Sequence, residues 1–245
     1  MESPSSQRLR KIEEQILTTL RGYGIAGEVA LANPARPASE LAKVGIAKGY
    51  TTIVAIGGDR TINGVATAIQ NSNRAAMGII PLDACVRASE IIGVGADSPL
   101  DACEILRMRT IVSTDILLID PAKYVLTEAH VESVTELPVR VHIDDVVMET
   151  MITRLSICGD GSVELINTLQ GRSPIRQTFD RFMGHKLEPA NVTHMKGKYI
   201  KVETNRALPI KSGSDTIAKT PFVAAVKPDA LKLIVKRDKV RVANS

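Results

Sequence analysis

One stretch of the chain combines residue types that can bind an anion. Residues 51–56 (TTIVAI) have the β-branched, apolar character of a buried strand, and they lead directly into Gly57 and Gly58. Apolar residues then recur at helical spacing over 61–70. Glycines let a backbone approach a ligand closely, and the amide groups and dipole at a helix start favour negative charge. The segment therefore predicts a phosphate-binding turn between a strand and a helix.

The polar side chains of this turn suit the same chemistry. Asp59 can orient Mg²⁺ or a hydroxyl group, and Asn63 can hydrogen-bond a phosphate or a ribose. The alternative is an ordinary tight strand–helix turn in which Asp59 or Thr61 caps the helix. Glycine, glycine and aspartate alone do not decide between these two interpretations.

The elements around the turn alternate between strand and helix patterns. This alternation predicts a parallel sheet with helices on both faces, in a domain that covers residues 1–109. The expected strands are 28–32, 51–56 and 76–80, and the expected helices are 9–20, 39–48, 61–70, 84–92 and 99–107.

The pattern changes after Arg109, where strand-like runs follow one another with turn residues between them. A second domain over residues 110–245 is therefore expected to be antiparallel and rich in β-structure, with a short helix at 174–183. The expected strands are 110–119, 124–131, 139–143, 146–158, 162–169, 198–204, 222–226 and 231–235.

The composition narrows the class of protein. Of 245 residues, 44% are hydrophobic and only 3% aromatic, with no Trp, which disfavours aromatic stacking platforms for single-stranded nucleic acid. A net charge of +4 suits an anionic small molecule or a membrane surface but is far from a nucleic-acid-binding signature. The three cysteines fit neither a disulfide framework nor a zinc site, so a cytoplasmic protein is expected, with peripheral membrane contact left open.

Two blocks of the sequence resemble one known family. Residues 57–65 (GGDRTINGV) resemble the GGDGT signature of the diacylglycerol kinase catalytic-domain family, which includes bacterial lipid kinases, sphingosine kinases and, more distantly, NAD kinases. Residues 78–82 (GIIPL) match the start of its GIIPLGTxND motif. Later similarities to the family's strands and helix lie at residues 160–165, 179–185, 196–203 and 221–235. Their order along the chain is that of the family.

The resemblance implies both a fold and a function. The fold is an α/β Rossmann-like N-terminal domain of the NAD kinase and diacylglycerol kinase type, followed by an antiparallel β-sandwich, with nucleotide bound between them. Members transfer the γ-phosphate of ATP to a lipid hydroxyl with Mg²⁺ and sit peripherally on membranes. By the resemblance, the nucleotide-binding residues are Gly57, Gly58, Asp59, Thr61 and Asn63. Arg60, whose guanidinium could clamp a phosphate, and Asp83, at a strand end, are further binding candidates because of their positions. Asp59 and Asp215 are the catalytic candidates, and no resident metal-ligand set is assigned.

Several departures fall on the chemistry. The fourth signature glycine is Arg60, the Glu of the following helix start is Gly64, and the polar residues of GTxND are replaced by Ala84, Val86 and Arg87. At the family's DGE position the chain reads 212–216 (SGSDT), which leaves Asp215 as the remaining acid. The first strand and its phosphate loop are also expected to be missing. An open sheet edge there favours a homodimer or a rearranged N-terminus.

Three functions remain open at this point. The first is an ATP-dependent lipid kinase with reduced or lost activity, because phosphoryl transfer depends on positioning and charge stabilisation. The second is a non-catalytic relative that binds nucleotide or lipid as a regulatory or scaffold subunit. The third is an NAD kinase-like enzyme, which the late match at 221–235 disfavours.

The remaining polar residues have mainly structural interpretations. Asp83 follows a strand end, where ligands of open α/β sheets gather, but a helix-cap role is equally compatible with its position. His185 and His194 are expected to be structural residues of a loop, and Asp144 and Asp145 are expected to form a turn.

Overall fold

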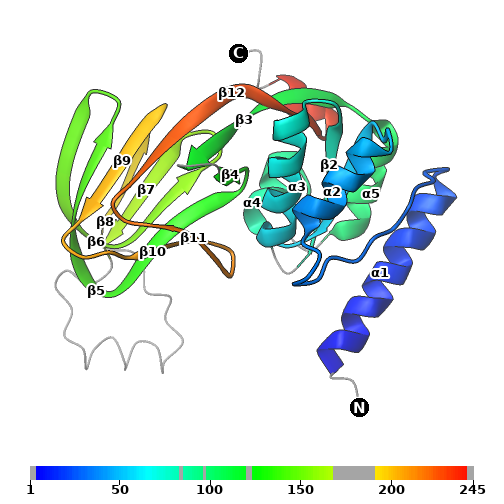
Figure 1. The fold of residues 1–245 in the computed structure, drawn as a ribbon, viewed down its shortest axis with the longest axis horizontal. Helices are drawn as coiled ribbons and strands as arrows, with labels where there is room; N and C mark the ends of the chain where they lie inside the picture. Colours follow the sequence, from blue (N-terminus) through cyan, green and yellow to red (C-terminus); the bar gives the residue numbers. More distant parts are fainter. Residues whose placement is uncertain (1–3, 83–84, 96–97, 120–122, 168–190, 242–245) are drawn as a thin grey trace. The chain divides into compact units, whose positions relative to one another are not determined.

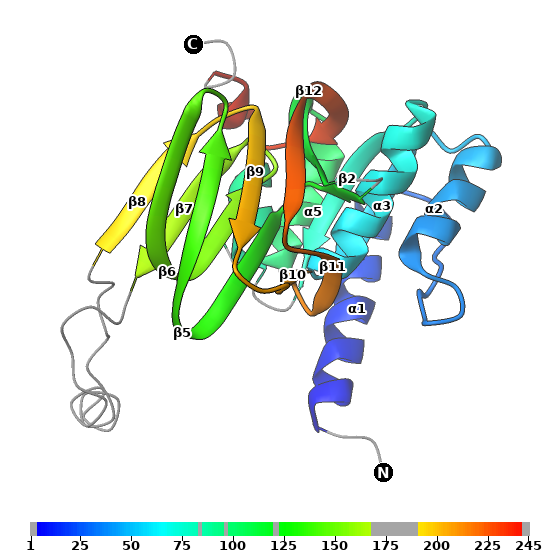
Figure 2. The ribbon, with the colours of Figure 1, turned by 60° about the vertical axis from the view of Figure 1, so that its left-hand side comes forward.

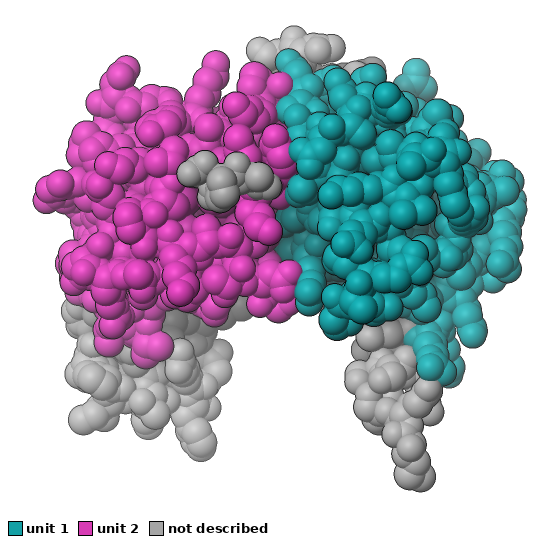
Figure 3. All heavy atoms as spheres, in the orientation of Figure 1, with its two compact units in different colours: residues 1–114, 229–245 teal, residues 115–228 magenta. Residues whose placement is uncertain are grey.

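The structure is a computed structural model that describes residues 4–82, 85–95, 98–119, 123–167 and 191–241 (Figure 1). It separates into two compact units, coloured separately in Figure 3. Unit 1 contains residues 1–114 and 229–245, and unit 2 contains residues 115–228. An α/β N-terminal part followed by antiparallel strands confirms the fold class expected from the sequence.

Unit 1 contains the parallel strands β1 (Thr52–Gly57) and β2 (Ala76–Pro81), which pair along their whole length. Every residue of β2 is buried. Helix α5 packs closely on β2 because Gly78 has no side chain, and a Cβ there would lie 2.4 Å from Cδ2 of Leu106. The helices are α1 (Pro4–Gly22), α2 (Ala38–Ala47), α3 (Asp59–Ser72), α4 (Val86–Ile92) and α5 (Pro99–Met108).

The outer edge of β1 differs from the expectation. Among the described residues, β1 pairs only with β2, so its other edge carries no strand. The expected strand at 28–32 has no regular secondary structure and joins no sheet, and it exposes Val29 and Leu31. Its alternating pattern is that of a strand, but a strand forms only where a neighbouring edge accepts its hydrogen bonds.

Unit 2 is a set of long antiparallel strands, seen as the curved sheet in Figure 2. The core is formed by the alternate inward residues of these strands, such as Val141, Leu155 and Ile157. The strands are β4 (Lys123–Val125), β5 (Glu128–Ile143), β6 (Val146–Cys158), β7 (Ser162–Asn167), β8 (Asn191–Lys196), β9 (Tyr199–Thr204), β10 (Pro209–Ser212) and β11 (Asp215–Lys219).

Two strands contribute residues to both units, β3 (Ile111–Ile119) and β12 (Phe222–Ile234). Residues 222–225 of β12 pair with β9 in unit 2, whereas Leu233 pairs in parallel with Met77 of β2 in unit 1. The final residues, including the 3₁₀ helix at Arg237–Arg241, therefore belong with unit 1. This grouping differs from the expected second domain at 110–245, because the periodicity of 231–235 reveals a strand but not the sheet that the strand joins.

The remaining expected elements correspond closely to observed ones, except in four places. The expected strand at 124–131 is divided between β4 and β5, and β5 continues through the expected strand at 139–143. The runs at 222–226 and 231–235 form one strand, β12, and the hairpin β10–β11 and strand β8 were not expected. The expected helix at 174–183 lies outside the described residues. None of the described helices combines the length and the apolar character needed to cross a bilayer.

Candidate functional site

The predicted phosphate-binding turn lies between β1 and α3. Gly57 ends the strand with φ of +149°, Gly58 is the helix N-cap in an extended conformation, and α3 begins at Asp59. The amide of Ile62 donates to the carbonyl oxygen of Gly58 at 3.1 Å, which is the first bond of the helix. Gly57, Gly58 and Asp59 are all partly exposed, so the turn is open to solvent within unit 1.

Gly57 is required by this geometry. Its φ lies in a region that residues with a side chain rarely adopt, and a Cβ there would be 3.0 Å from Oγ1 of Thr61. Thr61 occupies the first turn of α3 and folds back over the glycine. The sequence therefore needs glycine at this position to bring the strand end close to the helix start.

Asp59 is positioned by a partner far away in the sequence. Its Oδ1 accepts a hydrogen bond from the thiol of Cys85 at 3.0 Å, and Cys85 is buried at the N-cap of α4. The amide of Leu82 donates to the carbonyl oxygen of Gly57 at 3.1 Å. The segment that follows β2 is thus tied to the turn at two points.

The other predicted turn residues differ in accessibility. Arg60 is exposed, Thr61 is half-buried, and Asn63 is only 9% exposed, with Ile62 and Val65 buried on either side of it along α3. The backbone carbonyl of Asn63 accepts a hydrogen bond from Oγ1 of Thr67. Asn63 therefore presents less of its amide to a ligand than the sequence pattern suggested.

The segment after β2 shows what replaces the family's polar motif. Asp83 and Ala84 lie outside the described residues. Val86 is exposed at the first position of α4, and Arg87 pairs with Glu90 of the same helix at 3.2 Å. Neither Val86 nor Arg87 supplies the amide or carboxylate oxygen that the family motif carries there.

Asp215 lies in unit 2, at the start of β11. It pairs with Ser212 across the tight turn of the β10–β11 hairpin and is half-buried. Ser212 is 2% exposed and donates its hydroxyl to the carbonyl oxygen of Glu128 at 2.7 Å. Because Asp59 belongs to unit 1, a shared role for Asp59 and Asp215 stays a prediction.

Other candidates have structural roles. Asp144, at φ of +50° in the β5–β6 turn, accepts hydrogen bonds from the amides of Lys198 and Tyr199. His194 lies on β8 opposite Glu164, not in a loop, and His185 is outside the described residues. In the part of the chain that the structure describes, no three His, Cys, Asp or Glu residues form a group that could hold a metal ion.

Two surface hollows lie in unit 2, and neither contains a predicted site residue. The larger, of about 550 Å³, is lined by β5, β6 and the end of β9. The smaller, of about 270 Å³, is lined by Asp115, Asp144, Asp160 and Lys196 among others.

Two arrangements escaped the sequence analysis. The contact between Cys85 and Asp59 joins residues 26 positions apart, and no local pattern signals it. A polar cluster on β5 and β6 joins Glu128 to Arg154 at 2.6 Å and to Ser156 at 2.8 Å. Its signal is the alternation of polar residues along two strands, which reveals the face but not the pairing.

The comparisons with known proteins agree on one group. Residues 2–119 match the family model described as "Diacylglycerol kinase catalytic domain". No protein of curated function matches the sequence.

Three similar solved structures come from Bacillus anthracis str. Sterne. A diacylglycerol kinase is 17% identical with a TM-score of 0.68 over 92% of each chain. Two structures of a putative diacylglycerol kinase are each 18% identical, with TM-scores of 0.63 and 0.62, over 82% of this chain and 83% of theirs. At these identities the structures establish the fold.

The family match includes β1, the Gly57–Asn63 turn and the segment after β2, and thus every described residue of the turn. Residues 2–119 therefore resemble the diacylglycerol kinase catalytic domain, and the chain has the fold of bacterial diacylglycerol kinase structures.

Proposed function

We propose that this chain binds the phosphates of ATP at the Gly57–Asn63 turn and is a lipid kinase-like protein whose phosphoryl transfer is strongly reduced. The observation that carries the proposal is the turn geometry: a side-chain-free strand end, partly exposed, placed directly before a 14-residue helix. Backbone amides and the helix dipole stabilise phosphate oxygens at such a position. The family match in the same residues supports nucleotide as the ligand.

The residues present fit a nucleotide that brings its own metal ion. Mg²⁺ is usually held by one or two carboxylates together with substrate phosphates, and Asp59 is the carboxylate at the turn. The Cys85 thiol holds one oxygen of Asp59 and so fixes the carboxylate in place. When bound, Mg²⁺ would neutralise charge on the phosphates, while this chain's residues bind and orient them.

The expected loss of activity follows from missing polar groups. Ser212 is buried and donates to a backbone carbonyl, so it offers neither a carboxylate nor a free hydroxyl. Val86 and Arg87 replace an amide and a carboxylate of the family motif. Because transfer rates depend on positioning and charge stabilisation, losing several such groups lowers the rate by orders of magnitude while binding is retained.

The test separates binding from transfer. A thermal shift with Mg-ATP, ADP and NAD reports binding, since a ligand held only by the folded state raises Tm. Labelled ATP with diacylglycerol in mixed micelles reports transfer as labelled phosphatidic acid. We expect a shift with ATP and ADP and transfer barely above background.

Two results would overturn the proposal. If no nucleotide raises Tm, the turn is not a nucleotide site. If transfer is rapid and disappears in Asp59→Ala, the protein is a competent kinase and the inferred loss of activity is wrong.

A non-catalytic role is the second candidate, and the replacements at Ser212, Val86 and Arg87 favour it. Such a relative would bind nucleotide or lipid as a regulatory subunit. Complete absence of labelled phosphatidic acid, together with a nucleotide-dependent rise in Tm, would identify it.

A further inference from the structure

The hairpin β10–β11 is attached to the rest of unit 2 by an unusually short stretch of sheet. Among the residues that the structure describes, strand β5 pairs with β9 at the five positions 139–143, but with β10 only where Lys211 lies opposite His130. Figures 1 and 2 both show the hairpin beside the end of β5 where residue 128 begins the strand. Few backbone hydrogen bonds therefore hold β10 against β5, and side chains must supply the remaining attachment.

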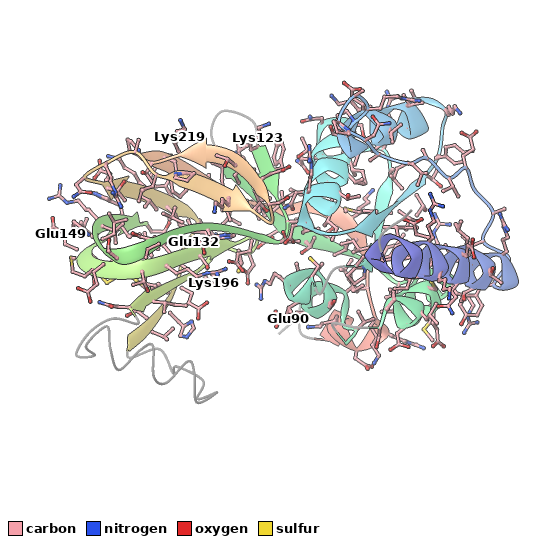
Figure 4. All side chains as sticks on the ribbon, turned by 90° about the horizontal axis from the view of Figure 1, so that it is seen from below. Glu90, Lys123, Glu132, Glu149, Lys196 and Lys219 are labelled. Carbon is pink, nitrogen blue, oxygen red and sulfur yellow. The ribbon has the colours of Figure 1, made fainter. Side chains whose placement is uncertain are left out.

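Three side chains of β10 make this attachment. Ile210 is buried in the core of unit 2. Ser212 donates its hydroxyl to the carbonyl oxygen of Glu128 at 2.7 Å. Between them, Lys211 points to the other face, where its Nζ lies 3.3 Å from Oε1 of Glu132, the residue labelled on β5 in Figure 4.

His130 lies between these groups and is mostly buried, with 14% of its side chain exposed. Its Nδ1 is 3.7 Å from Oε1 of Glu128. The same oxygen of Glu128 already accepts hydrogen bonds from Arg154 at 2.6 Å and from Ser156 at 2.8 Å.

The charged groups near His130 come from three strands. Glu128 and Glu132 lie on β5, Arg154 lies on β6, and Lys211 lies on β10. Each carboxylate is already paired with a cation, Glu128 with Arg154 and Glu132 with Lys211. An imidazolium at His130 would add a third positive charge to two ion pairs whose charges already balance. It would lie opposite Lys211, whose contact with Glu132 holds the hairpin against β5.

We propose that His130, Glu128, Glu132, Arg154 and Lys211 form a pH-sensitive latch, in which neutral His130 keeps the β10–β11 hairpin closed on β5 and protonation releases it. Repulsion between the imidazolium and Lys211 weakens the contact of Lys211 with Glu132. The single residue pair between β10 and β5 then opens more often. The opening of the hairpin can be measured without nucleotide or phosphoryl transfer.

The pKa of His130 is shifted in the direction that this latch requires. Burial, followed by the positive charge of Arg154, lowers the pKa of His130 below its ordinary value. These effects outweigh the attraction of Glu128 and Glu132, and Lys211 adds a smaller lowering. A lowered pKa means that the closed state favours neutral imidazole, whereas the open state takes up the proton more readily. Opening therefore becomes easier as the pH falls from the ordinary histidine range towards the lowered pKa of the closed state.

Amide hydrogen exchange of the whole protein measures the opening directly. Protection factors, corrected for intrinsic exchange, are compared at pH 7.5 and 5.5 for residues 210–218 and, as an internal reference, for residues 163–166 of β7. We expect the hairpin to lose about two- to fivefold protection relative to β7, the scale of one screened charge contact. Equal relative protection at both pH values would overturn the proposal.

Variants of single residues show whether His130 causes the pH-dependent loss of protection in the hairpin. His130→Gln should abolish the pH-dependent loss of protection, and Lys211→Met should reduce it because the repelled cation is gone. His142→Gln is the matched control, since His142 lies on the same strand but contacts Glu203, 3.3 Å away; it should leave the loss unchanged. Retention of the full effect in His130→Gln would refute the latch. Unchanged protection of β7 shows that each variant is folded.

Discussion

The thiol of Cys85 donates a hydrogen bond to Oδ1 of Asp59 at 3.0 Å, and this contact joins the start of α4 to the turn between β1 and α3. Cys85 is buried, so water does not compete freely for the thiol. The bond fixes one oxygen of Asp59, so the orientation of this carboxylate depends on both α3, where Asp59 lies, and the N-cap of α4. The segment that follows β2 thus stabilises the turn that follows β1.

Replacing Cys85 tests this support. Cys85→Ala should lower the free energy of unfolding by about 1 kcal/mol, because a hydrogen bond to a charged group and some buried volume are lost together. Urea denaturation measures the change. Cys158→Ala is the control, since Cys158 is only half-buried, and it should cost clearly less. Equal costs would show that the contact with Asp59 contributes nothing.

The conformation of Gly57 predicts strict intolerance to a side chain. Gly57→Ala should destabilise the protein by about 1–3 kcal/mol, because its φ of +149° is unfavourable for alanine and the new Cβ meets Thr61. Thermal or urea unfolding checks the value. Gly27→Ala, at an exposed position with no atom within 4 Å of the added Cβ, should change stability little. A harmless Gly57→Ala would contradict the strained turn.

The ion pair of Glu128 predicts a loss of stability in acid. Burial alone would raise the pKa of Glu128, but hydrogen bonds from Arg154 and Ser156 outweigh it and hold the pKa below its ordinary value. The stabilisation is present above the ordinary glutamate pKa and is lost as the pH falls through the lowered one. Glu128→Gln should therefore weaken folding at pH 7 and flatten the acid limb of a stability–pH curve. An unaltered acid limb would show that another carboxylate is responsible.

The cysteines should differ sharply in reactivity. Desolvation raises the pKa of Cys103 to about 11, so its thiolate is scarce at pH 8, and Cys85 is also buried. Cys158 is half-buried and should be alkylated first by iodoacetamide in the native protein. Mass spectrometry of peptides after short labelling gives the order. Faster labelling of Cys103 than of Cys158 would contradict this account.

How far the sequence predicts the structure depends on the range of the interactions. Residues 51–56 are a continuous apolar run, and Ile62, Val65 and Ile69 repeat at helical spacing, so β1 and α3 could be predicted locally. The segment 28–32 has a strand pattern but does not pair with the open edge of β1, and no local pattern reveals this. The β10–β11 hairpin was missed because residues 209–219 mix lysine, serine and threonine without a clear alternation.

In the candidate site, too, some features could be predicted from the local sequence and others depend on residues far apart in the chain. The glycines and Asp59 follow from the strand–helix pattern, whereas the Cys85 partner and the burial of Asn63 depend on tertiary packing. Likewise, the periodicity of 231–235 predicts a strand but not that Leu233 joins β2. A local sequence pattern permits several strand pairings, and contacts between residues far apart in the chain decide which of these pairings forms.

Calorimetric titration of Mg-ATP into the protein and into Gly58→Val tests the central claim most directly. Gly58 has an extended backbone that valine can adopt, so the variant should fold while its side chain covers the amides of the turn. We expect the wild-type protein to bind ATP and Gly58→Val to bind at least about tenfold more weakly, with Gly27→Val unaffected. ATP binding of equal strength in Gly58→Val, or none in the wild-type protein, would contradict phosphate binding at this turn.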